Sequence, residues 1–143
     1  MSPDTLFQSA SLTAMVGWLL LLIGPLAPAL TNRIAGLVIP ALLSVGYAAL
    51  VLAFWSGASG GFDSLPNVML LFTNPWIALA GWVHYLAFDL FLGAWAARKG
   101  RAAAIPHLVM IPVLALTLLF GPIGFVLFLS LSLIWRLRAP LPA

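Results

Sequence analysis

The chain has 143 residues, of which 64% are hydrophobic and only 6% are charged, whereas a soluble domain usually has about 25% charged residues. So few polar groups cannot cover a surface in contact with water, which excludes a water-soluble domain and indicates an integral membrane protein. Six basic against three acidic residues are too few for a nucleic-acid-binding face, and the absence of cysteine excludes disulfides, thiolate metal sites and cysteine nucleophiles.

Four apolar segments are each long enough to cross the hydrocarbon core of a bilayer, which needs about 20 residues of helix. They cover approximately residues 6–30, 34–55, 75–97 and 105–135. Backbone polar groups in lipid must be satisfied within the segment, so helices are expected rather than open strands. The predicted fold class is all-α, a polytopic membrane protein whose residues 1–143 form a single four-helix transmembrane domain.

The connections carry signals of their own. The polar tripeptide TNR at 31–33 predicts a tight turn between the first two helices. Within the long connection 56–74, the apolar stretch 68–72 predicts a segment that lies at the membrane interface. The pair NP at 74–75 is typical of a helix start, and Gly100 is expected to end the third helix in a left-handed cap.

The last apolar segment contains GPIG at 121–124, and each flank of this motif is too short to span a bilayer alone. The sequence therefore predicts a Gly-Pro kink in the last helix, and leaves open whether this is one kinked helix or two half-helices that meet inside the protein.

The distribution of basic residues predicts an orientation. Arg33 and the cluster at 98–101 lie in the two short connections, whereas Asp4, Asp63 and the arginines at 136–138 lie on the other side if all four helices cross. The positive-inside rule then places both termini on the non-cytoplasmic side, and the compact connections favour a bacterial inner membrane.

The third apolar segment holds an aspartate and a histidine at membrane depth. Asp89 lies near the middle of the segment, where ionisable groups are rare and are usually functional. His84 precedes it by five residues, about 140° around a helix, so direct pairing of the two is not expected. Asp89 is interpreted either as a helix-to-helix hydrogen-bonding group or as a proton donor, and His84 either as a hydrogen-bonded core residue or as a base. Tyr85, one turn before Asp89, is expected to hydrogen-bond its carboxyl or to stand near a bound oxygen.

An aromatic set surrounds these groups and is predicted to contact a flat, conjugated ligand, although such a stripe is also typical of helix packing or of a lipid-facing surface. The predicted substrate-binding residues are Trp82, Phe88, Phe91, Trp95 and Tyr47. No histidine or acidic spacing typical of a metal site is present, and no phosphate loop or dinucleotide fingerprint occurs, so no cofactor is expected.

The motifs resemble a known family. The sequence WVHYL at 82–86, followed by DLF at 89–91, is similar to the signature of the abscisic-acid-deficient-four type, named after a plant plastid protein required for neoxanthin formation. The GPIG motif at 121–124 resembles the family's proline-glycine mark in the last helix. The resemblance implies a membrane protein that acts on a carotenoid, and the plant member is linked to isomerisation of the epoxide violaxanthin to the allene neoxanthin. Asp89 as acid and His84 as base would suit such a reaction.

Three functions are therefore considered: a carotenoid or isoprenoid isomerase, a non-catalytic membrane subunit or assembly factor, and a small proton-coupled transporter that uses Asp89. The transporter is disfavoured because the first helix carries no acid within its apolar run. Membrane lipids and a carotenoid or isoprenoid ligand are the expected partners, with no nucleic acid. Small residues at Gly17, Ala35, Gly36 and Gly46 permit the close helix approach that a homodimer would need.

Overall fold

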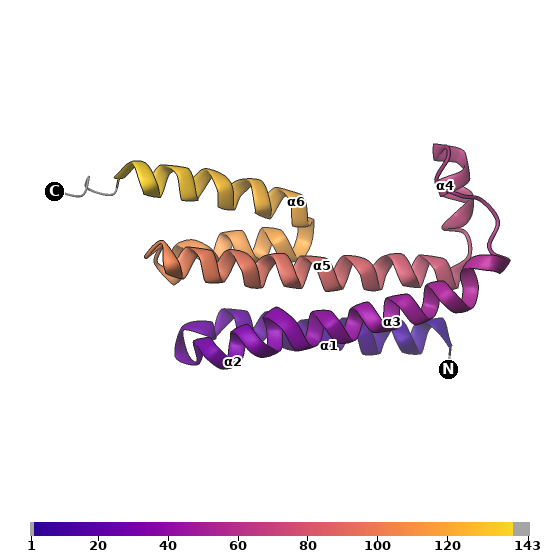
Figure 1. The fold of residues 1–143 in the computed structure, drawn as a ribbon, viewed down its shortest axis with the longest axis horizontal. Helices are drawn as coiled ribbons and strands as arrows, with labels where there is room; N and C mark the ends of the chain where they lie inside the picture. Colours follow the sequence, from indigo (N-terminus) through magenta and orange to yellow (C-terminus); the bar gives the residue numbers. More distant parts are fainter. Residues whose placement is uncertain (1, 139–143) are drawn as a thin grey trace.

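The structure, a computed structural model, describes residues 2–138 and is helical, as predicted. Four helical segments of residues 2–138 are long and apolar enough to cross a membrane: Pro3–Leu22, Pro28–Gly57, Pro75–Ala102 and His107–Trp135. The central helix is α5, which packs against α1, α3 and α6 (Figure 1). The elements in chain order are α1 (Pro3–Leu22), α2 (Pro28–Arg33), α3 (Ile39–Phe54), α4 (Leu65–Leu71), α5 (Pro75–Ala102) and α6 (His107–Arg138), with short 3-10 turns at Gly24–Leu26 and Trp55–Gly57 and a π-helical turn at Ile34–Val38.

The first turn lies earlier than the sequence predicted. The chain reverses at the 3-10 turn Gly24–Leu26 and resumes a helix at Pro28, so the polar residues 31–33 belong to helix α2 and not to a turn. Proline at 25 and 28 has no backbone N–H to donate and suits the first turn of a helix, which explains both the break and the restart. The buried Thr31 hydroxyl then donates to the Leu20 carbonyl oxygen at 3.3 Å and joins α2 to the end of α1.

The start of α5 was predicted correctly. The Asn74 side-chain oxygen accepts a hydrogen bond from the Trp76 N–H at 2.9 Å, which caps the helix, with Pro75 in its first position. The end differs, because Gly100 stays inside the helix and the left-handed residue is Ala104, at φ 53°. A side chain at Gly100 would lie 2.8 Å from the Met110 sulfur atom, so this glycine permits close packing of α6 and does not cap α5.

Helix α6 contains the Gly-Pro kink, and the kink is a full reversal of direction. Phe120 has non-helical dihedral angles, φ −148° and ψ 57°, and divides the helix into a first limb, residues 107–119, and a second limb, residues 121–138. The two limbs lie side by side and run in opposite directions (Figure 1). Met110 and Val113 of the first limb share a buried cluster with Phe128 of the second. Of the two arrangements left open by the sequence, the structure therefore has two half-helices.

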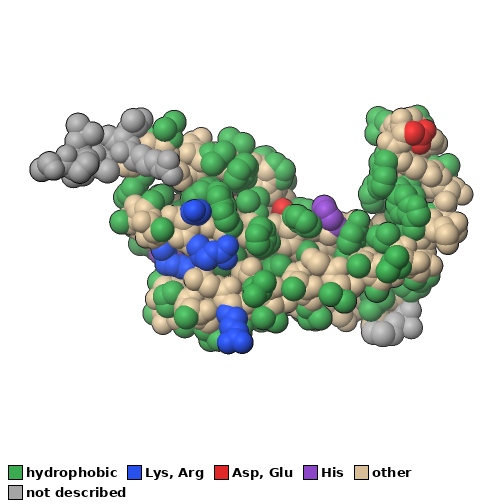
Figure 2. Space-filling view, viewed as in Figure 1, with side chains coloured by type: hydrophobic (Ala, Val, Ile, Leu, Met, Phe, Trp, Pro, Cys, Tyr) green, Lys and Arg blue, Asp and Glu red, His purple; other side chains and the backbone are tan. Residues whose placement is uncertain are grey.

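This reversal bears on the predicted sidedness of the termini, which stays a prediction. The start of α1 and the end of α6 lie at opposite ends of the long axis (Figure 1), whereas the expectation that both termini share one side assumed four complete crossings. Basic side chains gather at the end where α1 meets α2 and α5 meets α6 (Figure 2). The arginines at 136–138 belong to the last turn of α6, which returns to this same end.

Small residues on α1 and α5 let these helices pack closely. A side chain at Gly17 would meet Leu90, and one at Gly93 would lie 2.7 Å from the Trp18 ring. Ala35 is buried and Gly36 contacts Arg98, so they also serve contacts within the chain, whereas a side chain at Gly46 would meet no atom within 4 Å. A homodimer remains a prediction, for which Gly46 is the open small residue.

Candidate functional site

The predicted site residues of α5 are divided between two faces of the helix. Tyr85 and Asp89 turn towards the reversal of α6, and Trp82 turns towards α1. His84 and Phe88 lie on the face beside α3, where their rings stack at 4.7 Å between centroids. This division follows from the helical period, because residues four apart share a face and residues five apart do not.

Asp89 and Tyr85 both contact the broken backbone of α6. The Tyr85 hydroxyl donates to the Leu118 carbonyl oxygen at 2.7 Å, at the end of the first limb. The Asp89 carboxyl group lies against Gly121, whose backbone N–H faces it at the start of the second limb. A broken helix leaves unpaired N–H and C=O groups that lipid cannot satisfy, so these two side chains supply what the reversal lacks. One oxygen of Asp89, Oδ2, is buried and has no hydrogen-bond partner among the described residues.

Two of the predicted aromatic residues serve packing. The Trp82 indole N–H donates to the Ser11 hydroxyl at 3.0 Å, and its ring packs against Phe7 of α1. Trp95 packs against Phe125 and Phe128 in the second limb of α6. Neither shares a cavity with His84, so the structure does not bring the full predicted aromatic set together.

His84 lines a hollow between α3, α5 and α4. The hollow has a volume of about 240 Å³, and in the surface view the molecule is concave between α4 and the tip of α6, with histidine and acidic side chains on the floor formed by α5 (Figure 2). Tyr47 of α3 also lines it, with its ring centroid 5.5 Å from that of His84. The remaining walls are apolar: Val51, Trp55, Phe62, Leu71, Phe72, Ile77, Ala80 and Gly81.

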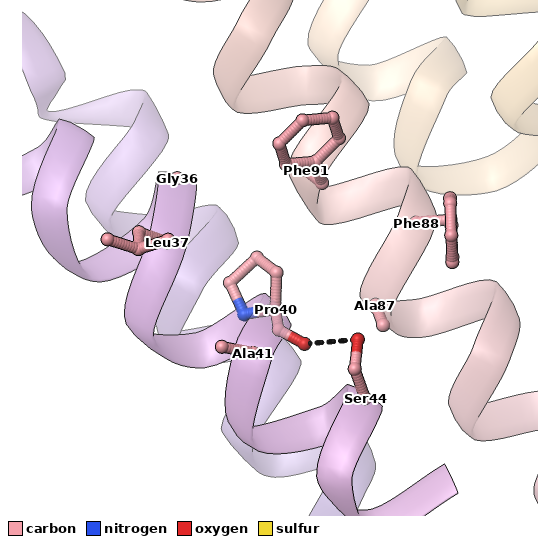
Figure 3. A pocket seen from close by; sticks show the side chains of 8 residues that line it. All are labelled: Gly36, Leu37, Pro40, Ala41, Ser44, Ala87, Phe88 and Phe91. Carbon is pink, nitrogen blue, oxygen red and sulfur yellow. Dashed lines mark hydrogen bonds between the residues drawn. The ribbon is translucent and has the colours of Figure 1, made fainter. Parts of the chain in front are cut away.

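A second cavity continues along the same seam between α3 and α5 (Figure 3). This groove has a volume of about 270 Å³. Its walls are Gly36, Leu37, Pro40, Ala41 and Ser44 from the α3 side and Ala87, Phe88 and Phe91 from α5. The Ser44 hydroxyl donates to the Pro40 carbonyl oxygen at 2.8 Å, so it is occupied by its own helix. Phe88 and Phe91 are 59% and 45% exposed, which leaves their rings free to contact an apolar ligand.

The hollow and the groove are consecutive. Ser44 and Tyr47 are one turn apart on α3, and His84 stacks on Phe88 at the point where the cavities meet. The seam thus offers apolar surface with an imidazole and a phenol near its middle, which is suited to a long apolar molecule that carries one reactive polar group. No cluster that could hold a metal ion occurs in residues 2–138.

Sequence reasoning missed the part of the site that α4 and its connection supply. Phe62 and Phe72 wall the hollow, and a side chain at Gly81 would lie 2.7 Å from the Phe72 ring. The apolar stretch 68–72 could have indicated a segment that packs over another part of the chain, because its side chains would otherwise be exposed. That this stretch packs over α5 beside His84 could not be predicted without the fold.

Comparison with known proteins gives one match. The family model ABA4-like, described as ABA DEFICIENT 4-like, matches residues 5–128. The chain belongs to the ABA4-like family. No curated protein and no solved structure matches.

The ABA4-like match covers both halves of the site. It extends from α1 through α5 and the reversal of α6 to Phe128, where the second limb packs against Trp95. The seam between α3 and α5 and the contact of Asp89 with Gly121 therefore both lie within the family region.

Proposed function

We propose that this ABA4-like protein is a cofactor-independent isomerase that acts on a carotenoid or another isoprenoid lipid. The observation that carries the proposal is the position of His84, an imidazole on the wall of an apolar hollow that continues into an aromatic-lined groove. Membership of the ABA4-like family supports a substrate from carotenoid metabolism. Ligand sites are typically apolar with a few well-placed polar groups, as here.

The shape of the seam supports a long, narrow substrate. From Gly36 to Trp55 the α3 side of the seam spans 19 residue steps, roughly 28 Å at 1.5 Å per residue. A rod-like polyene fits such a path, with its end group in the hollow near His84 and its conjugated chain against Phe88 and Phe91. The exposed rings of Phe88 and Phe91 leave the groove accessible from outside the chain, so in the proposal a membrane-dissolved substrate enters without passing through water.

The chemistry needs proton transfer only. In the opening of an epoxide to an allenic alcohol, His84 accepts a proton from the carbon beside the ring, and the released electron pair forms the new double bond while the C–O bond breaks. The oxygen takes a proton from the Tyr47 hydroxyl, which regains one from the His84 imidazolium. Atoms and electrons balance without an oxidant or reductant. Histidine suits this exchange because it changes charge near neutral pH.

Asp89 has a different part in this proposal. It lines neither the hollow nor the groove, and its carboxyl group lies at the reversal of α6. In this proposal Asp89 supports the reversal of α6 and takes no part in the proton transfer, and Tyr47 replaces it as the acid expected from the sequence.

The test is expression in a carotenoid-producing bacterial host that makes epoxy-carotenoids, with pigments separated by chromatography. The wild-type protein is expected to produce an isomer of unchanged mass, and His84→Ala is expected to lower its yield by about 10²-fold or more, the range for loss of a general base. His107→Gln is the matched control, because His107 contacts the Leu22 carbonyl at the far end of the molecule. An unchanged pigment profile with His84→Ala, at equal protein level, would remove the proposal.

A second candidate, a non-catalytic membrane subunit, is favoured by one observation. Tyr85 and Asp89 are used by the backbone of α6, so their presence at membrane depth needs no chemistry. Mass spectrometry of lipids that co-purify with the wild-type protein separates the two candidates. A bound polyene or terpenoid supports the isomerase, whereas co-purification of a partner protein with no isomer formed supports the subunit.

A further inference from the structure

Arg98 lies where the groove between α3 and α5 reaches the basic end of the molecule. Gly36 forms this end of the groove, and a side chain at Gly36 would lie 2.7 Å from the Nη1 atom of Arg98. Arg98 follows Phe91 by two helical turns on α5, so the guanidinium continues the same face on which the groove residues lie. An apolar channel therefore leads directly to a positive charge.

Among residues 2–138, no acidic side chain pairs with this charge. Of the chain's three acidic residues, Asp4 is in the first turn of α1 and Asp63 precedes α4, both at the opposite end, and Asp89 is in the middle of α5. Arg101, one turn beyond Arg98, donates to the Asn32 side-chain oxygen at 2.6 Å, and its other terminal nitrogen, Nη1, is buried with no partner in the described residues.

We propose that this groove binds one acyl chain of an anionic phospholipid, whose phosphate pairs with Arg98. The apolar walls suit the chain, because the Ser44 hydroxyl is already bonded to its own helix. The guanidinium suits the phosphate, since arginine binds its oxygens with two parallel N–H bonds. The site does not depend on the catalytic proposal, but a resident lipid and a polyene would compete for the same groove.

Lys99 provides a matched control for the charge. It is the next residue of α5 and carries the same charge, but it lines a different cavity, together with Trp95 and Phe128 on the α6 side. A general attraction of the basic end to an anionic membrane surface would involve both residues equally. A site in the groove would depend on Arg98 alone.

The experiment is native mass spectrometry of the full chain in detergent, titrated with phosphatidylglycerol or with phosphatidylcholine of identical acyl chains. The wild type is expected to retain the anionic lipid in preference to the zwitterionic one. Arg98→Gln is expected to weaken phosphatidylglycerol binding about fivefold, and Lys99→Gln by no more than about twofold. Equal losses in the two variants would overturn the proposal.

Two further arms test the groove itself. Ala41→Trp fills the groove from an exposed position and is expected to displace both lipids, whether or not the Arg98→Gln variant folds. Glycerol phosphate, which carries the headgroup charge without acyl chains, is expected not to compete. Undiminished lipid binding by Ala41→Trp, or full competition by glycerol phosphate, would show that the acyl chain is not held in the groove and would overturn the proposal.

Discussion

The two faces of α5 carry similar kinds of side chain, but in residues 2–138 only the first face has hydrogen-bond partners for its ionisable groups. On the first face, Tyr85 contacts the Leu118 carbonyl and Asp89 contacts Gly121, so the reversal of α6 uses both polar groups. On the second face, the His84 ring contacts those of Phe88 and Tyr47, and His84 and Phe88 border the two cavities. An ionisable group at membrane depth can thus have a structural or a chemical reason, and the identity of its partner distinguishes them.

The polar groups of the first face are explained by the free-energy cost of the break in α6. Breaking a helix inside a membrane exposes backbone groups that lipid cannot hydrogen-bond, at several kcal/mol for each unsatisfied group. A tyrosine hydroxyl that meets a free carbonyl and a carboxyl group that meets a free N–H remove part of this cost. The second face has no such requirement, because α3 beside it is continuous past Tyr47. The isomerase proposed above would give its histidine a chemical role.

The largest expected effect is on membrane topology, because the reversal of α6, which Tyr85 and Asp89 support, decides on which side α6 ends. If α6 turns back, the last turn of α6 lies at the basic end, which the positive-inside rule places in the cytoplasm, and the start of α1 lies outside. Fusions at the C-terminus in a bacterial host are expected to give a fluorescent green fluorescent protein and an inactive alkaline phosphatase, and N-terminal fusions the reverse. An active phosphatase at both ends would instead support the four complete crossings expected from the sequence.

A smaller effect, on stability, is expected from a side chain placed between the two limbs of α6. A side chain at Gly124 would collide with the Thr117 backbone, whereas one at Gly46 would meet nothing within 4 Å. Gly124→Ala is therefore expected to lower the free energy of unfolding by about 1–3 kcal/mol through overpacking. Gly46→Ala is expected to leave it unchanged or raise it by up to about 1 kcal/mol. Unfolding in a detergent-to-dodecyl-sulfate titration measures both, and equal effects would mean that the limbs are not in close contact.

Much of the fold could be predicted because its signals are local. Apolar segments of sufficient length indicate spanning helices, and Asn74 followed by Pro75 caps α5 wherever the helix packs. The reversal of α6 could not be predicted, because a Gly-Pro pair permits a bend of any size. Its extent depends on contacts with Tyr85 and Asp89 from another helix, and such contacts leave no local pattern.

The candidate site was predictable in part for the same reason. The helical period correctly separates His84 from Asp89, since both lie on one helix. The period could not assign Trp95 to packing against α6 or bring Phe72 over the hollow, because each depends on the path of a neighbouring segment. Tyr47 could be predicted as one of the substrate-binding residues, but its ring position, 5.5 Å from that of His84 between centroids, depends on the packing of α3 on α5.

The smallest expected effect separates the two faces by means of the chain's two tyrosines. Tyr85→Phe removes the hydrogen bond to the Leu118 carbonyl and leaves that oxygen unsatisfied, so the free energy of unfolding is expected to fall by about 0.5–1.5 kcal/mol. Tyr47→Phe removes a hydroxyl from the wall of the hollow and is expected to change stability by less than about 0.5 kcal/mol while it lowers isomer formation. The same unfolding titration and pigment assay measure both variants. If Tyr47→Phe destabilised the protein as much as Tyr85→Phe, the α3 side would also be held by the chain's own hydrogen bonds, and the distinction between a structural and a chemical face would fail.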